Sequence, residues 1–334
     1  MSVIELSHGG GGAETQQLIQ KLFYEAYGNE VLIQGEDAAV LDLEGKTAFT
    51  TDSFTVTPIV FNGGDIGKLA IVGTINDLAM MGAEPLYLSC AFILEEGLPL
   101  STLKTVVNSM AVEIRASGAK IVCGDTKVVP KGAVDKLFIN TSGIGKLLRV
   151  DGFPSAHGLQ EGDAILVSRD IGAHGATIIA ERESLKLDCD LQSDCAQLWP
   201  LVEALIANDI EIHALRDATR GGLAAVLNEW ATASGVCIEV EEEEVPISLP
   251  VQGLCELLGF EAYDFANEGT FVISLPAESA EAALQILHEF EAGHNAAQIG
   301  RVTRLQPGRV IVQTSWGSQR VLELPRGELL PRIC

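Results

Sequence analysis

Helix-like and strand-like segments are interleaved in both halves of this 334-residue chain, and this pattern most restricts the folds open to it. In the first half, a helix rich in small residues is expected over 67–81, and a second from Ser101, as its N-cap, to Gly118. An apolar strand over 120–123 then runs directly into Gly124-Asp125-Thr126-Lys127. Strands mixed with helices in this way predict α/β or α+β domains.

The same patterns locate the remaining elements and a division of the chain. Expected helices cover 18–26, 198–207, 222–233 and 278–290, and expected strands cover 38–41, 47–51, 137–140, 164–168, 236–240 and 271–274. Turn residues at 151–154 suggest a boundary, so we predict two domains, 1–153 and 154–321. Residues 322–334 contain two prolines and are expected to form an extended, mobile tail and not packed structure.

The composition restricts the partners and the compartment. Because the formal net charge is −24, the surface should repel nucleic-acid phosphates and anionic lipid, and we predict neither nucleic acid nor membrane as a partner. No apolar run approaches the roughly 20 residues that span a bilayer, and the N-terminus does not resemble a signal peptide. The seven scattered cysteines are typical of reduced thiols, which indicates a cytoplasmic protein.

Four acidic motifs lie in the first half, at expected strand ends or inside the helix rich in small residues. They are Glu36-Asp37-Ala38-Ala39, Thr51-Asp52-Ser53, Asn76-Asp77-Leu78 and Gly124-Asp125-Thr126-Lys127. Carboxylates gathered at strand ends repel one another unless cations hold them, as Mg²⁺ does when a triphosphate is bound. Each Asp taken singly is more often a turn or cap residue, but four in one half favour a metal–nucleotide site.

A run of four glycines, Gly9-Gly10-Gly11-Gly12, precedes the first expected helix. Its backbone N–H groups are suited to wrapping phosphates, although a flexible tether has the same composition, and both interpretations stay open. The stretch 63–68 is not a Walker A loop, because Asn62 stands where a glycine is needed and Leu69 follows the lysine in place of Ser or Thr.

Cysteine is the final residue, Cys334, and we expect it to be exposed in a way that the other six cysteines are not. A thiol on a tail of this kind can reach several sites, although an incidental terminal residue is the simpler explanation. Near the end of the second half, Glu268 precedes an expected strand in Asn267-Glu268-Gly269-Thr270, where it is either a turn carboxylate or a functional group.

Taken together and in this order, the motifs resemble the HypE family of hydrogenase maturation proteins, which are carbamoyl dehydratases. The matching stretches are 8–12, 37–39, 51–53, 73–79, 87–90, 124–129, 217–222, 265–269 and 331–334. The resemblance covers essentially the whole chain, and the ending Pro331-Arg332-Ile333-Cys334 is its most specific element. The wider superfamily is similar to aminoimidazole ribonucleotide synthetase, selenophosphate synthetase and thiamine monophosphate kinase, which use ATP on small nucleophiles.

The resemblance implies a two-domain aminoimidazole ribonucleotide synthetase-like fold, a homodimer whose N-terminal sheets pair into a barrel, and ATP with Mg²⁺ as cofactors. It assigns metal binding to Asp37, Asp52, Asp77 and Asp125. It assigns nucleotide binding to Gly9, Gly10, Gly11, Gly12, Asn76, Asp77 and Thr126. It assigns catalysis to Cys334, Lys127 and Glu268.

The implied activity is ATP-dependent dehydration of a carbamoyl group on Cys334 to a thiocyanate, which supplies the cyanide ligand of a nickel–iron hydrogenase. The implied partners are the carbamoyltransferase HypF as donor and a HypC–HypD complex as cyanide acceptor. Two alternatives remain. One is a small-molecule kinase or synthetase like the sister families, and the other is a non-catalytic carrier that binds nucleotide only to regulate docking.

Overall fold

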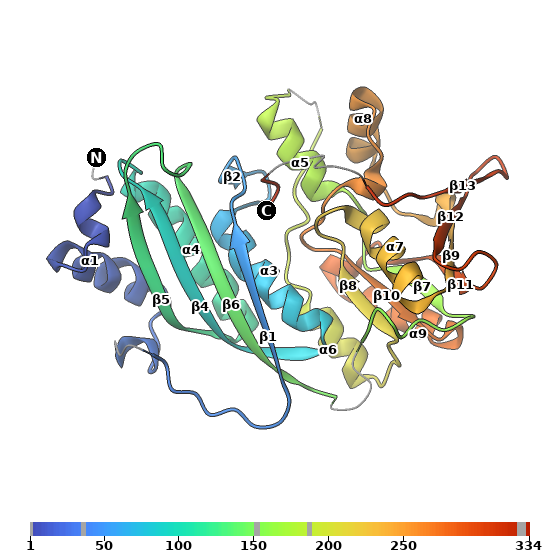
Figure 1. Cartoon of the computed structure of the whole chain (residues 1–334), viewed down its shortest axis with the longest axis horizontal. Coiled ribbons are helices and arrows are strands. Elements are labelled where there is room, and N and C mark those ends of the chain that lie inside the picture. Colours follow the sequence, from blue (N-terminus) through green and yellow to red (C-terminus); the bar gives the residue numbers. More distant parts are fainter. Residues whose placement is uncertain (1–2, 35–37, 150–153, 186–188, 326–331) are drawn as a thin grey trace. The chain divides into compact units, whose positions relative to one another are not determined.

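The computed structural model describes residues 3–34, 38–149, 154–185, 189–325 and 332–334 (Figure 1). By its internal contacts the chain divides into two compact units. The first consists of Met1–Leu78, Ala83–Leu147 and Cys334, and the second of Ala79–Gly82 and Leu148–Ile333. Asp37 and the expected turn at 151–153 lie outside the described residues.

A four-stranded sheet in the order β1-β6-β4-β5 organises the first unit. Its strands are β1 (Thr47–Phe54), β4 (Ala83–Glu95), β5 (Lys120–Val129) and β6 (Leu137–Leu147), with a small hairpin of β2 (Val60–Phe61) and β3 (Gly64–Asp65) beside them. β6 runs antiparallel to both of its neighbours, whereas β4 and β5 are parallel. Side chains alternate between two faces, and one face is covered by helices (Figure 1).

Two long helices cover that face, α3 (Ile66–Met80) and α4 (Leu100–Ser117). α3 is buried almost all round, which explains its small residues. A Cβ on Gly67 would lie 2.3 Å from the Val106 carbonyl oxygen, so only glycine lets α3 approach α4 this closely. α4 buries Leu103, Val106 and Met110, as its periodicity predicts, and ends at Gly118 in the left-handed conformation.

The N-terminal segment forms a chain of short helices at the β5 end of the sheet. They are η1 (Leu6–Gly9), α1 (Ala13–Leu18), the π-helical η2 (Ile19–Tyr24), α2 (Glu25–Tyr27) and η3 (Leu32–Gln34). The Phe23 ring stacks on Phe92 of β4 at 5.1 Å between centroids, so this segment is packed onto the sheet.

Two expectations about local structure in this unit are wrong. Residues 38–41 form no strand: no described strand pairs with them, and Val40 is 91% exposed. A short apolar run becomes a strand only where a sheet edge accepts it. Ser101 is not the N-cap of α4, because the helix begins at Leu100 and Pro99 is the cap.

The second unit is built on a seven-stranded sheet in the order β13-β12-β9-β11-β7-β10-β8. Its strands are β7 (Ala164–Val167), β8 (Ala214–Asp217), β9 (Cys237–Glu241), β10 (Phe271–Leu275), β11 (Ala297–Thr303), β12 (Arg309–Gln313) and β13 (Gln319–Val321). Its helices are α5 (Ala173–Arg182), α6 (Trp199–Ala207), α7 (Gly222–Ser234), α8 (Leu249–Leu258) and α9 (Ala280–Leu287), with single turns η4 (Glu242–Glu244), η5 (Ala262–Asp264), η6 (Ala277–Ser279) and η7 (Glu291–Gly293). One apolar core joins the sheet to α7 through Leu227, Trp230 and Val310.

The expectation of an unpacked C-terminal tail is wrong at both of its described ends. Leu322 is 3% exposed, and its backbone N–H donates to the carbonyl of Val310. Ile333 is 6% exposed. Both side chains are apolar, and burial removes them from water, which the prolines between them do not prevent.

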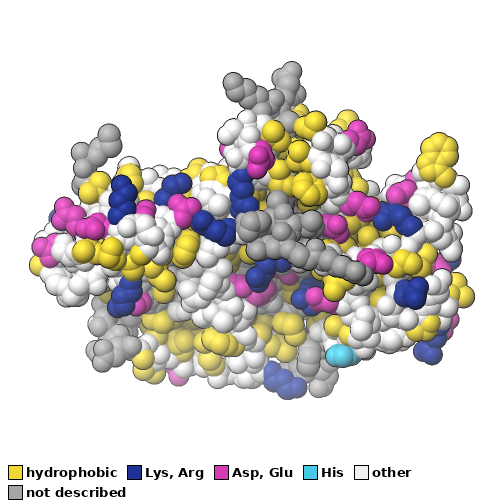
Figure 2. All heavy atoms as spheres, turned by 45° about the horizontal axis from the view of Figure 1, so that its top comes forward, with side chains coloured by type: hydrophobic (Ala, Val, Ile, Leu, Met, Phe, Trp, Pro, Cys, Tyr) yellow, Lys and Arg dark blue, Asp and Glu magenta, His cyan; other side chains and the backbone are white. Residues whose placement is uncertain are grey.

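Acidic and basic side chains are interspersed with hydrophobic ones on the face drawn in Figure 2. The net charge of −24 is therefore not collected into a single acidic field on this face.

We expect Asp65 to stabilise the start of α3. Its buried carboxylate accepts the N–H groups of Gly67 (2.8 Å) and Lys68 (3.0 Å) and the hydroxyl of Ser109. Asp65→Ala should lower the free energy of unfolding by about 1–2 kcal/mol in urea denaturation at pH 7, because the N–H groups lose their acceptor. Asp65→Asn retains an acceptor and should lose less. An Asn variant as unstable as the Ala variant would contradict this capping role.

The free energy of unfolding of these variants should depend on pH differently from that of the wild type. Burial raises the pKa of Asp65 in the folded chain. The folded state therefore binds the proton more tightly than the unfolded state, and this carboxyl contributes less stability as the pH rises from about 4 through its raised pKa. When the free energy of unfolding is measured between pH 4 and 7, Asp65→Asn should lack the decrease with pH that comes from this carboxyl.

Candidate active site

Two of the four N-terminal glycines are required by close packing or backbone conformation. A Cβ on Gly9 would lie 2.4 Å from the backbone nitrogen of Val128 in β5, so η1 packs directly against this strand. Gly11 has a φ of 79°, and its N–H donates to the Thr15 hydroxyl at 2.9 Å. Gly10 and Gly12 are exposed. The glycine run therefore forms a turn of defined conformation that is packed on the sheet, and it is not a flexible tether.

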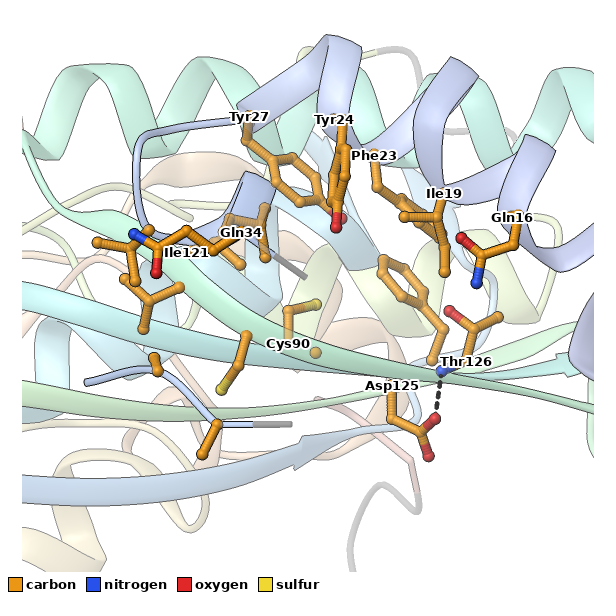
Figure 3. A pocket seen from close by; sticks show the side chains of 18 residues that line it. Gln16, Ile19, Phe23, Tyr24, Tyr27, Gln34, Cys90, Ile121, Asp125 and Thr126 are labelled. Carbon is orange, nitrogen blue, oxygen red and sulfur yellow. Dashed lines mark hydrogen bonds between the residues drawn. The ribbon is translucent and has the colours of Figure 1, made fainter. Parts of the chain in front are cut away.

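A cavity of about 260 Å³ lies between these N-terminal helices and the strands β4 and β5 (Figure 3). The helices contribute the aromatic rings of Phe23, Tyr24 and Tyr27, and the strands contribute Cys90 and Thr126. Burial is the main reason that the pKa of Tyr27 is raised, so its hydroxyl stays protonated at neutral pH and can donate a hydrogen bond. An aromatic cavity with a few polar groups at one side is suited to a flat heterocycle.

Two motifs from the sequence meet at this cavity. Ala38 and Ala39 line it from one motif, and Gly124, Asp125 and Thr126 line it from the other. The Asp125 carboxylate is turned toward the backbone, where it accepts the Thr126 N–H at 2.8 Å (Figure 3). These motifs lie more than 80 positions apart in the chain, so only the fold brings them together.

Asp125 lies inside a strand and not at the end of one, which corrects the expectation. β5 continues to Val129 because β4 pairs with it throughout, with Ala91 opposite Asp125. Lys127, two positions on, lies on the same face, and its Nζ is 3.4 Å from Asp125 Oδ1. Both side chains are about 60% exposed, with 63% for Lys127 and 60% for Asp125, so this ion pair is weak and Lys127 is available to a ligand.

Asp52 and Asp77 lie on the opposite side of the sheet. Asp52 is likewise inside a strand, paired with Thr141 of β6. Asp77 on α3 accepts the hydroxyl of Thr50 of β1 at 2.6 Å, and Asn76 beside it is 1% exposed.

The fold of a single chain does not bring the predicted metal ligands Asp52 and Asp125 close together. Asp52 is on the edge strand β1 and Asp125 on the edge strand β5, so the strands β6 and β4 separate them by about 14 Å, or three inter-strand spacings. No group of three or more His, Cys, Asp or Glu side chains suited to a metal ion occurs among the described residues. The assignment of Asp37, Asp52, Asp77 and Asp125 to a metal stays a prediction.

Glu268 belongs to a buried loop in the second unit that leads into β10. It is 3% exposed, which is not typical of a solvated turn carboxylate. Its backbone N–H donates to Asp194 Oδ1 at 3.1 Å, and the Gly269 N–H donates to Asp194 Oδ2 at 2.9 Å. The Thr270 hydroxyl donates to the same oxygen at 2.9 Å. Three donors thus hold the loop to one carboxylate.

Asp194 was missed by sequence reasoning, although it is 3% exposed and orders the Glu268 loop. It stands in Gln192-Ser193-Asp194-Cys195, which has neither periodicity nor motif spacing. A single buried carboxylate cannot be predicted from local sequence patterns, because its burial depends on partners 74 to 76 positions away.

Cys334 is half-buried and belongs to the first unit, where its carbonyl accepts the backbone N–H of Thr55 at 2.9 Å. We expected Cys334 to be more exposed than the other six cysteines, and this expectation is wrong. Cys189 is exposed, and Cys123 is half-buried like Cys334.

The fold and these motifs define a class of proteins. The model of the N-terminal domain of AIR synthase related proteins matches residues 35–147, and the model of their C-terminal domain matches residues 160–313. The predicted two-domain α/β fold is therefore confirmed. No helix in the described ranges is long and apolar enough to cross a membrane.

Within that class, the chain belongs to the carbamoyl dehydratase HypE family. It is 52% identical over 341 residues to the carbamoyl dehydratase HypE of Escherichia coli K12, with all of both chains covered. It is similar to a hydrogenase maturation protein HypE solved in complex with ATP, with a TM-score of 0.96, 48% identity and 99% of each chain covered. It also matches a chain of a HypE–HypF complex, with a TM-score of 0.81, 45% identity, and 94% of this chain and 100% of the other covered.

We expect Gly269 to be irreplaceable in the Glu268 loop. A Cβ at this position would lie 1.9 Å from the Asp194 carbonyl oxygen, so Gly269→Ala must displace one backbone or the other and should cost about 1–3 kcal/mol of stability. The matched control is Gly253→Ala in α8, where nothing lies within 4 Å of the added atom and the helix should gain slightly. Thermal unfolding of the two variants measures the difference, and equal midpoints would contradict the packing described here.

Proposed function

We propose that this chain dehydrates a carbamoyl group carried on the sulfur of its own Cys334 and converts it to a thiocyanate at the expense of ATP. The observation that carries the proposal is the seating of the chain's last residues. The carbonyl of Cys334 is hydrogen-bonded to Thr55, and Ile333 is buried, so the backbone that carries the thiol is held by the protein that is to act on it. Membership of the HypE family supports the same activity.

The proposed reaction needs ATP because the carbamoyl oxygen is a poor leaving group. Transfer of the γ-phosphoryl group to that oxygen lets it depart as phosphate, while the carbon–nitrogen bond becomes triple and both nitrogen protons are lost. The balance is –S–CO–NH₂ + ATP → –S–C≡N + ADP + phosphate + H⁺. Two groups of the protein are required, a cation near the oxygen and a base near the nitrogen.

Lys127 and Glu268 are proposed for these two tasks. The Lys127 ammonium is exposed and only weakly paired with Asp125, so it is available to stabilise the charge on the carbamoyl oxygen or the transferring phosphoryl group. Glu268 is 3% exposed, and a carboxylate in this position is proposed as the base that takes the nitrogen protons. Asp194 holds the backbone of the loop that carries this side chain.

The cavity beneath the N-terminal helices is proposed as the adenine site. Its aromatic rings suit the base, and for the phosphates Thr126 lies on β5, the strand against which Gly9 packs. A relative solved with ATP supports a nucleotide at this fold. Mg²⁺ commonly takes one or two carboxylates together with phosphate oxygens and water, so Asp52 with Asp77, or Asp125 with a phosphate, would suffice to hold it. When bound, the ion would offset triphosphate charge.

A homodimer and two partner proteins complete the proposal. β1 is an edge strand, and Phe49 on it is 71% exposed while Ile93 of β4 is 41% exposed on the same uncovered face, as expected if a second sheet packs there. A HypF carbamoyltransferase would supply the carbamoyl group, as the HypE–HypF complex of relatives suggests. A HypC–HypD complex would accept the cyanide in a cytoplasmic reaction.

The decisive test follows the mass of the C-terminal peptide. After carbamoylation by the donor enzyme or by cyanate, the Cys334 peptide should lose one water only when Mg²⁺ and ATP are added. Cys334→Ala should abolish the signal, whereas Cys189→Ala, which removes another accessible thiol, should not. Glu268→Gln should slow water loss about 100-fold or more without weakening ATP binding. A carbamoyl group that persists while ATP is hydrolysed would indicate a kinase or a carrier instead.

ATP should also protect a thiol in the cavity. Cys123 lines it and is half-buried, and desolvation raises the pKa of its thiol. N-ethylmaleimide should therefore label Cys123 slowly at pH 7 and faster as the pH rises, because only the thiolate reacts. Saturating ATP should slow this labelling several-fold at pH 8.5 and leave Cys189 unaffected. Equal rates with and without ATP would place the adenine elsewhere.

A further inference from the structure

Arg332 and Ile333, at the end of the second unit, are held within that unit through their backbone carbonyls. Nε2 of His174 in α5 lies 2.8 Å from the carbonyl oxygen of Ile333, and the Arg182 guanidinium at the end of the same helix donates to the carbonyl of Arg332. The Ile333 side chain is 6% exposed. Side chains of one helix thus bind two consecutive backbone carbonyls, and the side chain of the second of these residues is buried.

The geometry around His174 permits a single tautomer. A carbonyl can only accept, so Nε2 carries the proton and donates to Ile333. The other ring nitrogen, Nδ1, lies 2.8 Å from the Ser193 hydroxyl and accepts from it, and that hydroxyl oxygen in turn accepts the N–H of Cys195 at 3.1 Å. The ring is fully buried, and burial is the main cause that lowers the pKa of His174, so it is neutral at pH 7.

The residue after Ser193 is Asp194, the carboxylate that holds the Glu268 loop. Two adjacent residues therefore have two different tasks. The Ser193 hydroxyl orients the ring that binds the tail, and the Asp194 side chain anchors the loop that carries the proposed base. A displacement of this short segment would disturb both at once.

We propose that His174, Ser193 and Asp194 form a docking device that seats the C-terminal tail and the Glu268 loop in register for reaction. The ligand it recognises is this chain's own Arg332-Ile333 backbone, and His174 is a positioning residue that acts through the tail. The catalytic part of this inference rests on the proposed dehydration, whereas the docking part does not. A tail that visits other proteins needs a contact that breaks readily, and hydrogen bonds to backbone carbonyls are of this kind, because each contributes little net free energy in water.

The test compares the accessibility of Cys334 with turnover in the full-length protein. His174→Phe retains the ring shape but removes the bonds to Ile333 and Ser193, so N-ethylmaleimide labelling of Cys334 should accelerate about threefold to tenfold relative to Cys123. Dehydration of carbamoylated Cys334 should slow, while the uptake of carbamoyl from cyanate should not. The amide of Gln in His174→Gln can donate to the Ile333 carbonyl. This variant should therefore label Cys334 more slowly than His174→Phe and dehydrate the carbamoyl group faster.

The matched control is His288→Phe, which removes a histidine–carbonyl bond of the same kind, to Ala296, in the same unit. It should change neither rate. If His174→Phe does not fold, Ser193→Ala leaves the ring in place without its orienting hydroxyl and should accelerate labelling in the same direction. Unchanged Cys334 labelling in the folded variants would overturn the docking device. If Cys334 is labelled faster in the His174 variant but carbamoylated Cys334 of the wild type never loses water, the docking is supported and the proposed dehydration is refuted.

Discussion

The pairing of β4 with β6 on one side and β5 on the other is the constraint on which the first unit depends. Its register decides which side chains of the Gly124–Lys127 motif reach which face. Gly124 approaches Cys90 so closely that a Cβ would lie 2.3 Å from the Cys90 carbonyl oxygen, while Asp125 and Lys127 fall on alternate, exposed positions. The cavity beneath the N-terminal helices exists because these strands present apolar side chains to Phe23 and its neighbours.

Buried charge has the same organising role in the second unit. A carboxylate as buried as Asp194 is tolerated only when donors surround it, and the donors available are the backbone of the Glu268 loop and a threonine hydroxyl. The loop consequently has one conformation, and Gly269 is required by its close approach to the Asp194 carbonyl. The backbone of Glu268 is therefore held in place although it belongs to no helix or strand.

The proposed reaction makes two opposed demands on the C-terminal thiol. For that reaction the thiol would leave the protein to meet a donor and an acceptor, and it would return to a defined position for the chemistry. Backbone carbonyls bound by Thr55, His174 and Arg182, together with the buried Ile333 side chain, would meet the second demand. Since each such bond contributes little net free energy in water, the seat is compatible with release.

By itself, the sequence determined the α/β class, the principal helices and strands, and the family, because periodicity and motif order are local properties of the chain. It identified the Gly124–Lys127 motif, Glu268 and Cys334, but it misplaced a strand at 38–41 and gave no sign of Asp194 or His174. Only the tertiary structure decided that Asp52 and Asp125 lie on opposite edges of one sheet, and that the tail is seated. The reason is physical: sheet register, burial and hydrogen bonds between residues far apart in the chain arise only when the backbone closes on itself.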